Sequence, residues 1–187
     1  RFEDMLAGAH DMDRHFLTAP LNVNLPVVLG LIGIWNIDFL GAQGLAILPY
    51  DEGLRGLPNY LRQLEMESNG KALDRFGQPV EVGTATIVFG DPGTRGQHAF
   101  YQALHQGRQQ IACDFIAPME SRHAFGNHHD RLLANFFAQT EALMKGRVFD
   151  KADDVTESHH EANSLQDKQR PHREFEGNRP TNSILLD

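Results

Sequence analysis

The chain has 187 residues, of which 41% are apolar, enough for the buried core of one domain or of one large domain with appendages. Its formal net charge of −8 argues against a nucleic-acid partner, because such surfaces need clustered basic residues. Cys113 is the only cysteine, which excludes a disulfide within the chain and favours a reducing compartment, the cytoplasm. In a strand-like run, this thiol is expected to be buried and unreactive.

No part of the sequence is suited to a membrane. The longest apolar run, residues 25–40, contains Asn36 and Asp38 and is shorter than the roughly 20 residues of a membrane span. No signal peptide is visible, so we expect no membrane partner. The chain begins with Arg1 rather than methionine and ends on an apolar run, residues 183–187, so we expect a piece of a longer protein.

The first part of the chain predicts two helices. Residues 1–20 have apolar side chains at helical spacing, which predicts an amphipathic surface helix. Asn24 is a typical N-cap, and Pro26 suits the first turn of the helix that follows. That helix is apolar nearly all round as far as Leu40, so we expect it to be buried, and Gly41 should end it.

The remainder of the chain alternates between strand-like and helical patterns. Strand-like runs cover residues 45–50, 84–89, 110–117 and 183–187. Helical patterns cover residues 59–68, 97–106 and 128–145. A loop or small hairpin is expected at 71–83, and a solvated helix or mobile loop in the polar segment 147–172. The alternation predicts an α/β fold in which helices flank a parallel sheet and ligands bind at the carboxyl ends of the strands.

A glycine-rich turn, residues 90–98, connects the second strand-like run to a helical pattern. Strand, glycine-rich turn and helix together can point backbone N–H groups and a helix N-terminus at an anion. The turn has neither the Walker lysine nor a GxGxxG fingerprint. We therefore expect a general anion cradle, with His98 at the start of the helix.

Two titratable residues are candidates for proton transfer. Glu67 is near the C-terminal end of a predicted helix, where the helix dipole disfavours a carboxylate and makes it a stronger base. His98 is at a predicted helix N-terminus, where the dipole favours a neutral imidazole. We expect both near the carboxyl edge of the sheet, where they would suit proton transfer next to a carbonyl. The alternative is that Glu67 is a solvated helix-end acid and His98 a capping residue.

No metal site is expected. His128 and His129 are adjacent in sequence, as are His159 and His160, so the side chains of each pair diverge on a helix. No set of cysteine or acidic residues completes a zinc pattern. The other histidines are interpreted as surface or packing residues: His10, His15, His105 and His123.

Residues 66–71 read Met-Glu-Ser-Asn-Gly-Lys, and residues 90–98 read Gly-Asp-Pro-Gly-Thr-Arg-Gly-Gln-His. Further blocks of the same kind are residues 99–102, 105–107, 113–118 and 176–183, together with 7–10, 12–13, 34–35 and 135–139. In their content and order, these blocks strongly resemble the glucose-6-phosphate isomerase family, its bacterial-type members most closely. The resemblance covers nearly the whole chain.

The resemblance implies an aldose–ketose isomerase of glycolysis and gluconeogenesis that interconverts glucose 6-phosphate and fructose 6-phosphate through a cis-enediol. It implies a small-molecule sugar phosphate as the ligand, and neither a metal nor another cofactor. The family has two sugar-isomerase domains, each a parallel sheet flanked by helices. By this resemblance, residues 1–24 are expected to be a helix that remains from the preceding domain or linker. Residues 25–187 are the second sugar-isomerase domain, truncated at its C-terminus.

The resemblance also implies roles for individual residues. Glu67 matches the base that moves a proton between C2 and C1, His98 the histidine that helps open the sugar ring, and Gln63 a glutamine that contacts the substrate. The family forms homodimers in which each active site borrows its histidine from the partner. Asp91 and Arg95 depart from the family's turn, which usually has glutamate and asparagine there. Arg95 could favour a phosphate or crowd the loop.

The family's Gly-Gly-Arg signature, its serine and threonine phosphate cluster and its C-terminal lysine have no counterpart in this chain. We therefore expect the chain alone to be inactive, with the substrate phosphate held by the missing first domain. A non-catalytic sugar-phosphate-binding or interaction module is the alternative. The presence of both Glu67 and His98 favours the enzyme, because a sensor has no need of a base.

Overall fold

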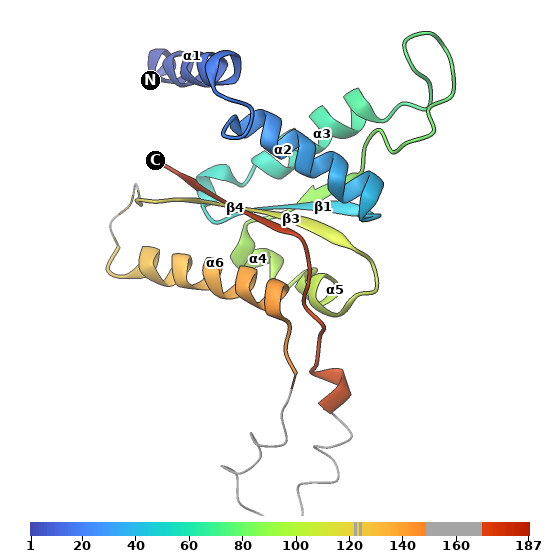
Figure 1. The fold of residues 1–187 in the computed structure, drawn as a ribbon. Helices are drawn as coiled ribbons and strands as arrows, with labels where there is room; N and C mark the ends of the chain where they lie inside the picture. The colour runs from blue at the N-terminus through green and yellow to red at the C-terminus, as the bar shows by residue number, and fades with distance from the viewer. Residues whose placement is uncertain (122, 124, 149–169) are drawn as a thin grey trace, which may run out of the picture. The chain divides into compact units, whose positions relative to one another are not determined.

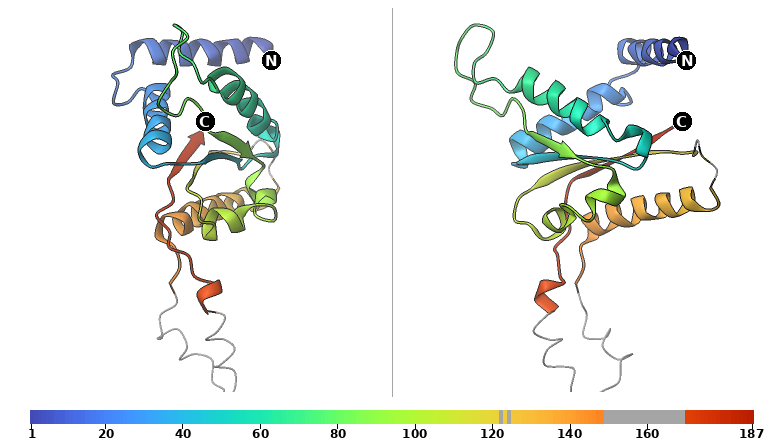
Figure 2. Two further views of the ribbon diagram at one scale, coloured as in Figure 1. Left: turned by 90° about the vertical axis from the view of Figure 1, so that its right-hand side faces the viewer. Right: turned by 180° about the vertical axis from the view of Figure 1, so that it is seen from behind.

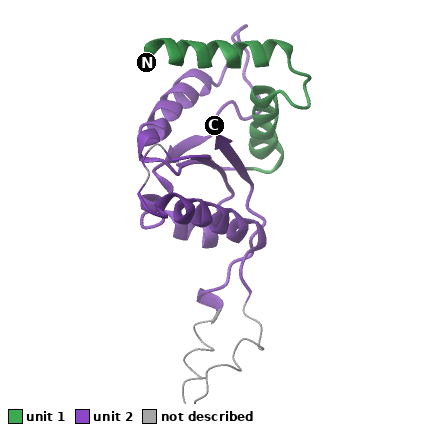
Figure 3. Cartoon of the chain, turned by 90° about the vertical axis from the view of Figure 1, so that its left-hand side faces the viewer, with its two compact units in different colours: residues 1–41 green, residues 42–187 purple. Residues whose placement is uncertain are grey.

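The computed structural model of the chain describes residues 1–121, 123, 125–148 and 170–187. This part of the chain forms two compact units, residues 1–41 and 42–187 (Figure 3). Most of the polar segment expected to be a solvated helix or a mobile loop lies outside the described residues. The domain boundary expected at residue 24 concerns a longer protein and stays a prediction.

The first unit is helical. Its elements are α1 (Phe2–Thr18), α2 (Leu25–Ile34) and the π-helix η1 (Trp35–Phe39), which continues α2. The side chain of Asn24 accepts a hydrogen bond from the Val27 N–H over 3.4 Å, which confirms Asn24 as the N-cap of α2. Gly41 follows the π-helix with a φ of +67°, which explains why a glycine ends it.

The expectation that α2 is buried is wrong for the described chain. None of its residues is buried, and the exposed fractions of Leu31 and Ile34 are 60% and 53%. The reason is geometric, because a helix that is apolar on every side needs neighbours on every side. Within its unit, the only other α-helix is α1.

The second unit contains a parallel sheet. Its strands are β1 (Gly44–Pro49), β2 (Ile87–Gly90), β3 (Ile111–Pro118) and β4 (Thr181–Leu186). They are ordered β2-β1-β3-β4, and every neighbouring pair is parallel. The prediction of an α/β fold with helices flanking a parallel sheet is confirmed (Figure 1).

Helices cover both faces of this sheet. They are α3 (Leu57–Asn69), α4 (Gly93–Gly96), α5 (Tyr101–Gln106) and α6 (His128–Lys145), with short 3-10 turns at η2 (Glu52–Leu54) and η4 (Arg170–His172). Side chains alternate along each strand. Ile47 and Val88 therefore pack toward α3, while Leu48 and Phe115 pack toward α5 and α6. Figure 2 shows α3 on one side of the strands and α4, α5 and α6 on the other.

Candidate functional site

The glycines of the turn at residues 90–98 allow the backbone to approach the core closely. A Cβ on Gly90 would lie 1.9 Å from the carbonyl oxygen of Ile47 on the neighbouring strand β1. A Cβ on Gly93 would lie 2.0 Å from the ring of Tyr50, and one on Gly96 would lie 2.9 Å from Phe100. None of these three spaces can hold a larger residue, so the glycines are explained by packing.

Several backbone N–H groups of the turn donate hydrogen bonds to carbonyl oxygens of the turn itself. Residues 95–100 all donate hydrogen bonds to carbonyl oxygens of residues 92–96. These six donors are therefore occupied. The anion cradle expected from the sequence is limited to the N–H groups before residue 95, and it stays a prediction.

His98 lies in the turn between α4 and α5, with its side chain exposed. The backbone N–H of His98 donates to the backbone carbonyl oxygen of Arg95 over 3.0 Å. The expected helix N-terminus at His98 is wrong, because the helical chain already begins at Gly93 and is interrupted at Phe100, where φ is −142°. The dipole argument from the sequence therefore does not apply to His98.

A buried polar cluster lies beneath the turn. The hydroxyl oxygens of Tyr50, at the end of β1, and Tyr101, on α5, are 3.2 Å apart. Gln97 Nε2 donates to Asn135 Oδ1 on α6 over 2.6 Å, and the Gln97 side chain partly opposes the rise in the pKa of Tyr50. Burial raises the pKa of both tyrosines, so they stay neutral hydrogen-bonding groups. Sequence reasoning missed this cluster, because its members come from four separate elements.

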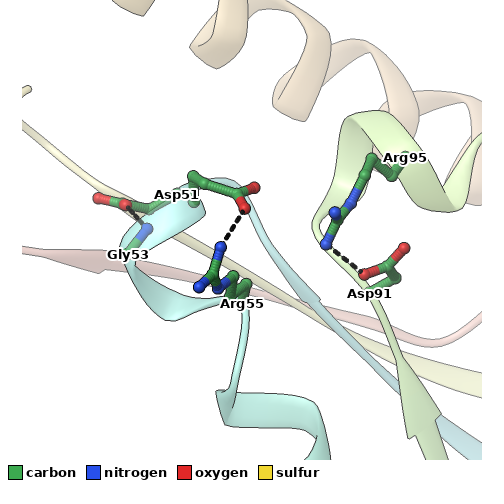
Figure 4. A network of polar contacts seen from close by, with 6 residues as sticks. Asp51, Gly53, Arg55, Asp91 and Arg95 are labelled. Carbon is green, nitrogen blue, oxygen red and sulfur yellow. Dashed lines mark hydrogen bonds and ion pairs between the residues drawn. The ribbon is translucent and has the colours of Figure 1, made fainter.

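Two arginines lie near the carboxyl ends of β1 and β2. Arg95 donates to Asp91 over 3.0 Å, and Arg55 donates to Glu52 over 3.5 Å. In the loop after β1, Asp51 also accepts from the Gly53 N–H over 2.6 Å. Figure 4 shows the two loops side by side, each with an arginine engaged by a carboxylate of its own loop. The charge of Arg95 is thus partly balanced by Asp91, the other residue that departs from the family's turn.

A hollow of about 560 Å³ opens beside His98. Its lining includes three histidines and two arginines: His98, His105, His172, Arg147 and Arg173. None of the described residues that line it is acidic. His105 is fixed by a contact of 2.9 Å between its Nε2 and Gln139 Oε1. The hollow can accept an anionic group next to the imidazole of His98.

Glu67 and Gln63 lie one helical turn apart on α3. Gln63 Nε2 donates to Glu67 Oε2 over 3.3 Å, and both side chains are exposed. Lys71 donates to the backbone carbonyl of Glu67 as the helix ends. Glu67 thus lies exposed in the last turn of α3, and its position near the end of a helix is as the sequence predicted.

Glu67 and His98 do not meet in one chain. The N–H of Val88, in the first half of β2, contacts Met66 Sδ over 3.5 Å, which places the end of α3 near the start of that strand. A crossover helix returns from the carboxyl end of one parallel strand to the start of the next. Glu67 therefore lies toward the amino edge of the sheet. Its helix α3 covers the face opposite to α4 and α5, as Figure 2 shows. The expected shared carboxyl edge is wrong.

The family model described as phosphoglucose isomerase matches residues 1–187, the full length of the chain. The chain belongs to the phosphoglucose isomerase family. The resemblance seen in the sequence blocks is thereby confirmed.

Relatives named glucose-6-phosphate isomerase are similar over nearly the whole chain. The protein from Methylococcus capsulatus is 52% identical over 185 residues, covering 99% of this chain and 34% of the relative. The protein from Gloeobacter violaceus is 54% identical over 186 residues, covering 100% of this chain and 32% of the relative. The chain thus spans about a third of the length of these curated phosphoglucose isomerases.

A solved structure shares the fold. The crystal structure of a glucose-6-phosphate isomerase from Chlamydia trachomatis matches with a TM-score of 0.79 and 32% identity, over 96% of this chain and 32% of that one. The match confirms a partial phosphoglucose isomerase domain. The roles of Glu67, His98 and Gln63 stay predictions.

Two further observations concern the described residues alone. They contain no group of three or more His, Cys, Asp and Glu side chains that could hold a metal ion. No described helix is both long and apolar enough to cross a membrane.

Proposed function

We propose that the protein to which this chain belongs interconverts glucose 6-phosphate and fructose 6-phosphate in the cytoplasm, as a step of glycolysis and gluconeogenesis. The observation that carries this proposal is the match to the phosphoglucose isomerase family over residues 1–187. Relatives named glucose-6-phosphate isomerase that are 52% and 54% identical support it. Residues 25–187 then belong to the second of two sugar-isomerase domains.

Glu67 is the proposed base. It takes the proton from C2 of the open-chain sugar and returns it to C1 through a cis-enediol, which needs an accessible carboxylate held in one orientation. Its exposure and the hydrogen bond from Gln63 support this role. Gln63 also contacts the substrate from one turn earlier on the same helix.

His98 is the proposed acid–base group for opening the sugar ring. An imidazole suits this step, because its ordinary pKa lies near neutral pH and it can both accept and donate a proton. The exposed position of His98 beside a basic hollow supports its use on an anionic sugar phosphate.

The proposed active assembly is a homodimer with shared active sites. Glu67 and His98 lie on elements that cover opposite faces of one sheet, which supports sites that combine Glu67 of one copy with His98 of another. The isolated 187-residue chain is then inactive, because it contains neither the partner nor the groups that hold the phosphate.

The alternative, a non-catalytic sugar-phosphate-binding or interaction module, is tested on the full-length protein. Replacement Glu67→Gln should lower kcat by roughly two to four orders of magnitude, the usual contribution of a general base. Glu65→Gln is the matched control, since Glu65 is on the same helix and accepts a hydrogen bond from Asn69 over 2.8 Å. A loss below about tenfold for Glu67→Gln places the base elsewhere.

A further inference from the structure

The His98 side chain has no hydrogen-bond partner among the described residues. A catalytic imidazole must nevertheless be held close to its productive position, because small displacements of such groups are costly in rate. Its orientation therefore depends on the segment that carries it. The nearest tether is the preceding residue, Gln97, whose Nε2 lies 2.6 Å from Asn135 Oδ1 on α6.

We propose that Gln97 and Asn135 are positioning residues for His98. Their side-chain bridge ties the turn at residues 90–98 to α6 and thereby fixes the direction of the imidazole. The inference rests on the proposed role of His98 in catalysis.

The turn has few other side-chain anchors to α6. Gly90, Gly93 and Gly96 contribute close backbone packing but no side chain. Asp91 and Arg95 pair with each other, four residues apart within the turn. Gln97 is thus the residue whose side chain leaves the turn and reaches another helix.

The α6 side of the bridge is rigid. Phe136 follows Asn135, is fully buried, and packs edge-on against Tyr50 and Phe115 with ring centroids 5.3 and 5.7 Å apart. Tyr50 in turn lies against Gly93 of the turn. Gln97 therefore ties the turn to an anchored helix, and breaking the bridge leaves a half-buried amide unpaired.

The test uses the full-length enzyme and two variants of one position. Asn135→Leu keeps the branching at Cγ but removes the acceptor, and it should lower kcat by about tenfold with less change in KM. Asn135→Asp keeps an acceptor oxygen for Gln97 and should stay within about threefold of wild type. Thr140→Val is the control, because it removes a hydrogen bond of α6, to the Phe137 carbonyl over 3.0 Å, without touching the turn.

A double-mutant cycle separates positioning from stability. In a His98→Asn background, Asn135→Leu should change the remaining kcat by less than about twofold, because its effect acts through His98. Equal losses in both backgrounds would show a general structural effect and overturn the proposal. Gln97→Met removes the donor of the same bridge. It should lower kcat as Asn135→Leu does, and should likewise have little effect in the His98→Asn background.

The outcomes also separate this inference from the proposed function. If His98→Asn loses most of its kcat while Asn135→Leu and Gln97→Met both keep wild-type kcat, the positioning role fails and the role of His98 stands. If His98→Asn keeps full activity, the catalytic role of His98 fails, and the positioning role fails with it.

Discussion

Glu67 and His98 lie on elements that cover opposite faces of a single four-stranded sheet, Glu67 on α3 and His98 between α4 and α5 (Figure 1). The arrangement follows from chain direction, because α3 carries Glu67 back toward the amino ends of the strands. A reaction that uses both groups at one substrate then requires two copies of the chain.

Mixing two inactive variants tests this requirement. Full-length Glu67→Gln and His98→Asn proteins should each keep only a small residual activity, and after dissociation and reassociation the mixture should recover activity far above that level. Each mixed dimer has one site with neither replacement, so random pairing gives about a quarter of wild-type activity. Activity is measured by following fructose 6-phosphate formation.

The control for this mixing experiment is a protein that carries both replacements in one chain. Mixed with either single variant, it should recover nothing, since every site then contains at least one replacement. Failure of the two single variants to complement each other, in dimers shown to be mixed, would mean that each site takes Glu67 and His98 from the same chain.

The core beneath the turn should be sensitive to truncation at Phe136. This side chain is 0% exposed and contacts the rings of Tyr50 and Phe115. Phe136→Ala should lower the free energy of unfolding of this chain by about 3–5 kcal/mol, measured by urea denaturation. Phe137→Ala, at a neighbouring position that is 49% exposed, should cost clearly less. Equal losses would mean that α6 is not packed through Phe136.

The thiol of Cys113 should be inert in the folded chain. Burial, followed by the nearby Asp114 carboxyl, raises its pKa to about 12, and 1% of the residue is exposed. At about pH 8, the reactive thiolate is therefore scarce and shielded from reagent. Ellman's reagent should detect no thiol in the native chain and one after unfolding in guanidinium. Fast reaction of the native chain would contradict the buried placement.

Stability should depend on pH through Asp114 on β3. Burial raises the pKa of this carboxyl, and the hydrogen bond from Asn182 Nδ2, over 2.8 Å, opposes the shift only in part. A carboxyl with a raised folded pKa binds protons more tightly in the folded state, so its contribution to stability falls as pH rises from its unfolded to its folded pKa.

Asp114→Asn removes this titration and keeps an acceptor oxygen for Asn182. The variant should gain stability relative to the original chain at about pH 8 and lose that advantage at about pH 4.5. Urea midpoints at the two pH values give the measurement. An advantage that is the same at both pH values would assign the effect to packing instead of charge.

Several elements could be predicted because their signals are local. Asn24 caps α2 through its own side chain, and Gly146 ends α6 with a φ of +72°. The helical spacing of residues 128–145 gave both ends of α6 correctly. Such features depend on contacts within a few residues, so a single stretch of sequence contains the information.

The break between α4 and α5 could not be predicted in this way. Residues 97–106 have helical spacing throughout, yet Phe100 leaves the helical region, and its ring packs edge-on against Phe89 of β2 with centroids 5.2 Å apart. A tertiary contact thus overrides a local preference, as is common for short helices. His98 therefore lies in the turn between α4 and α5 and not at the start of a helix, as the sequence had predicted.

The sequence by itself determined the family, the parallel α/β sheet, and Glu67, His98 and Gln63 as the candidate site residues. Only the tertiary structure decided that Glu67 and His98 lie on elements that cover opposite faces of the sheet, and that Gln97 bridges to Asn135, 38 residues further along the chain. The physical reason is that strand and helix periodicity depends on neighbours in sequence. Which face a crossover helix covers, and which polar groups meet beneath it, depends on how distant segments pack.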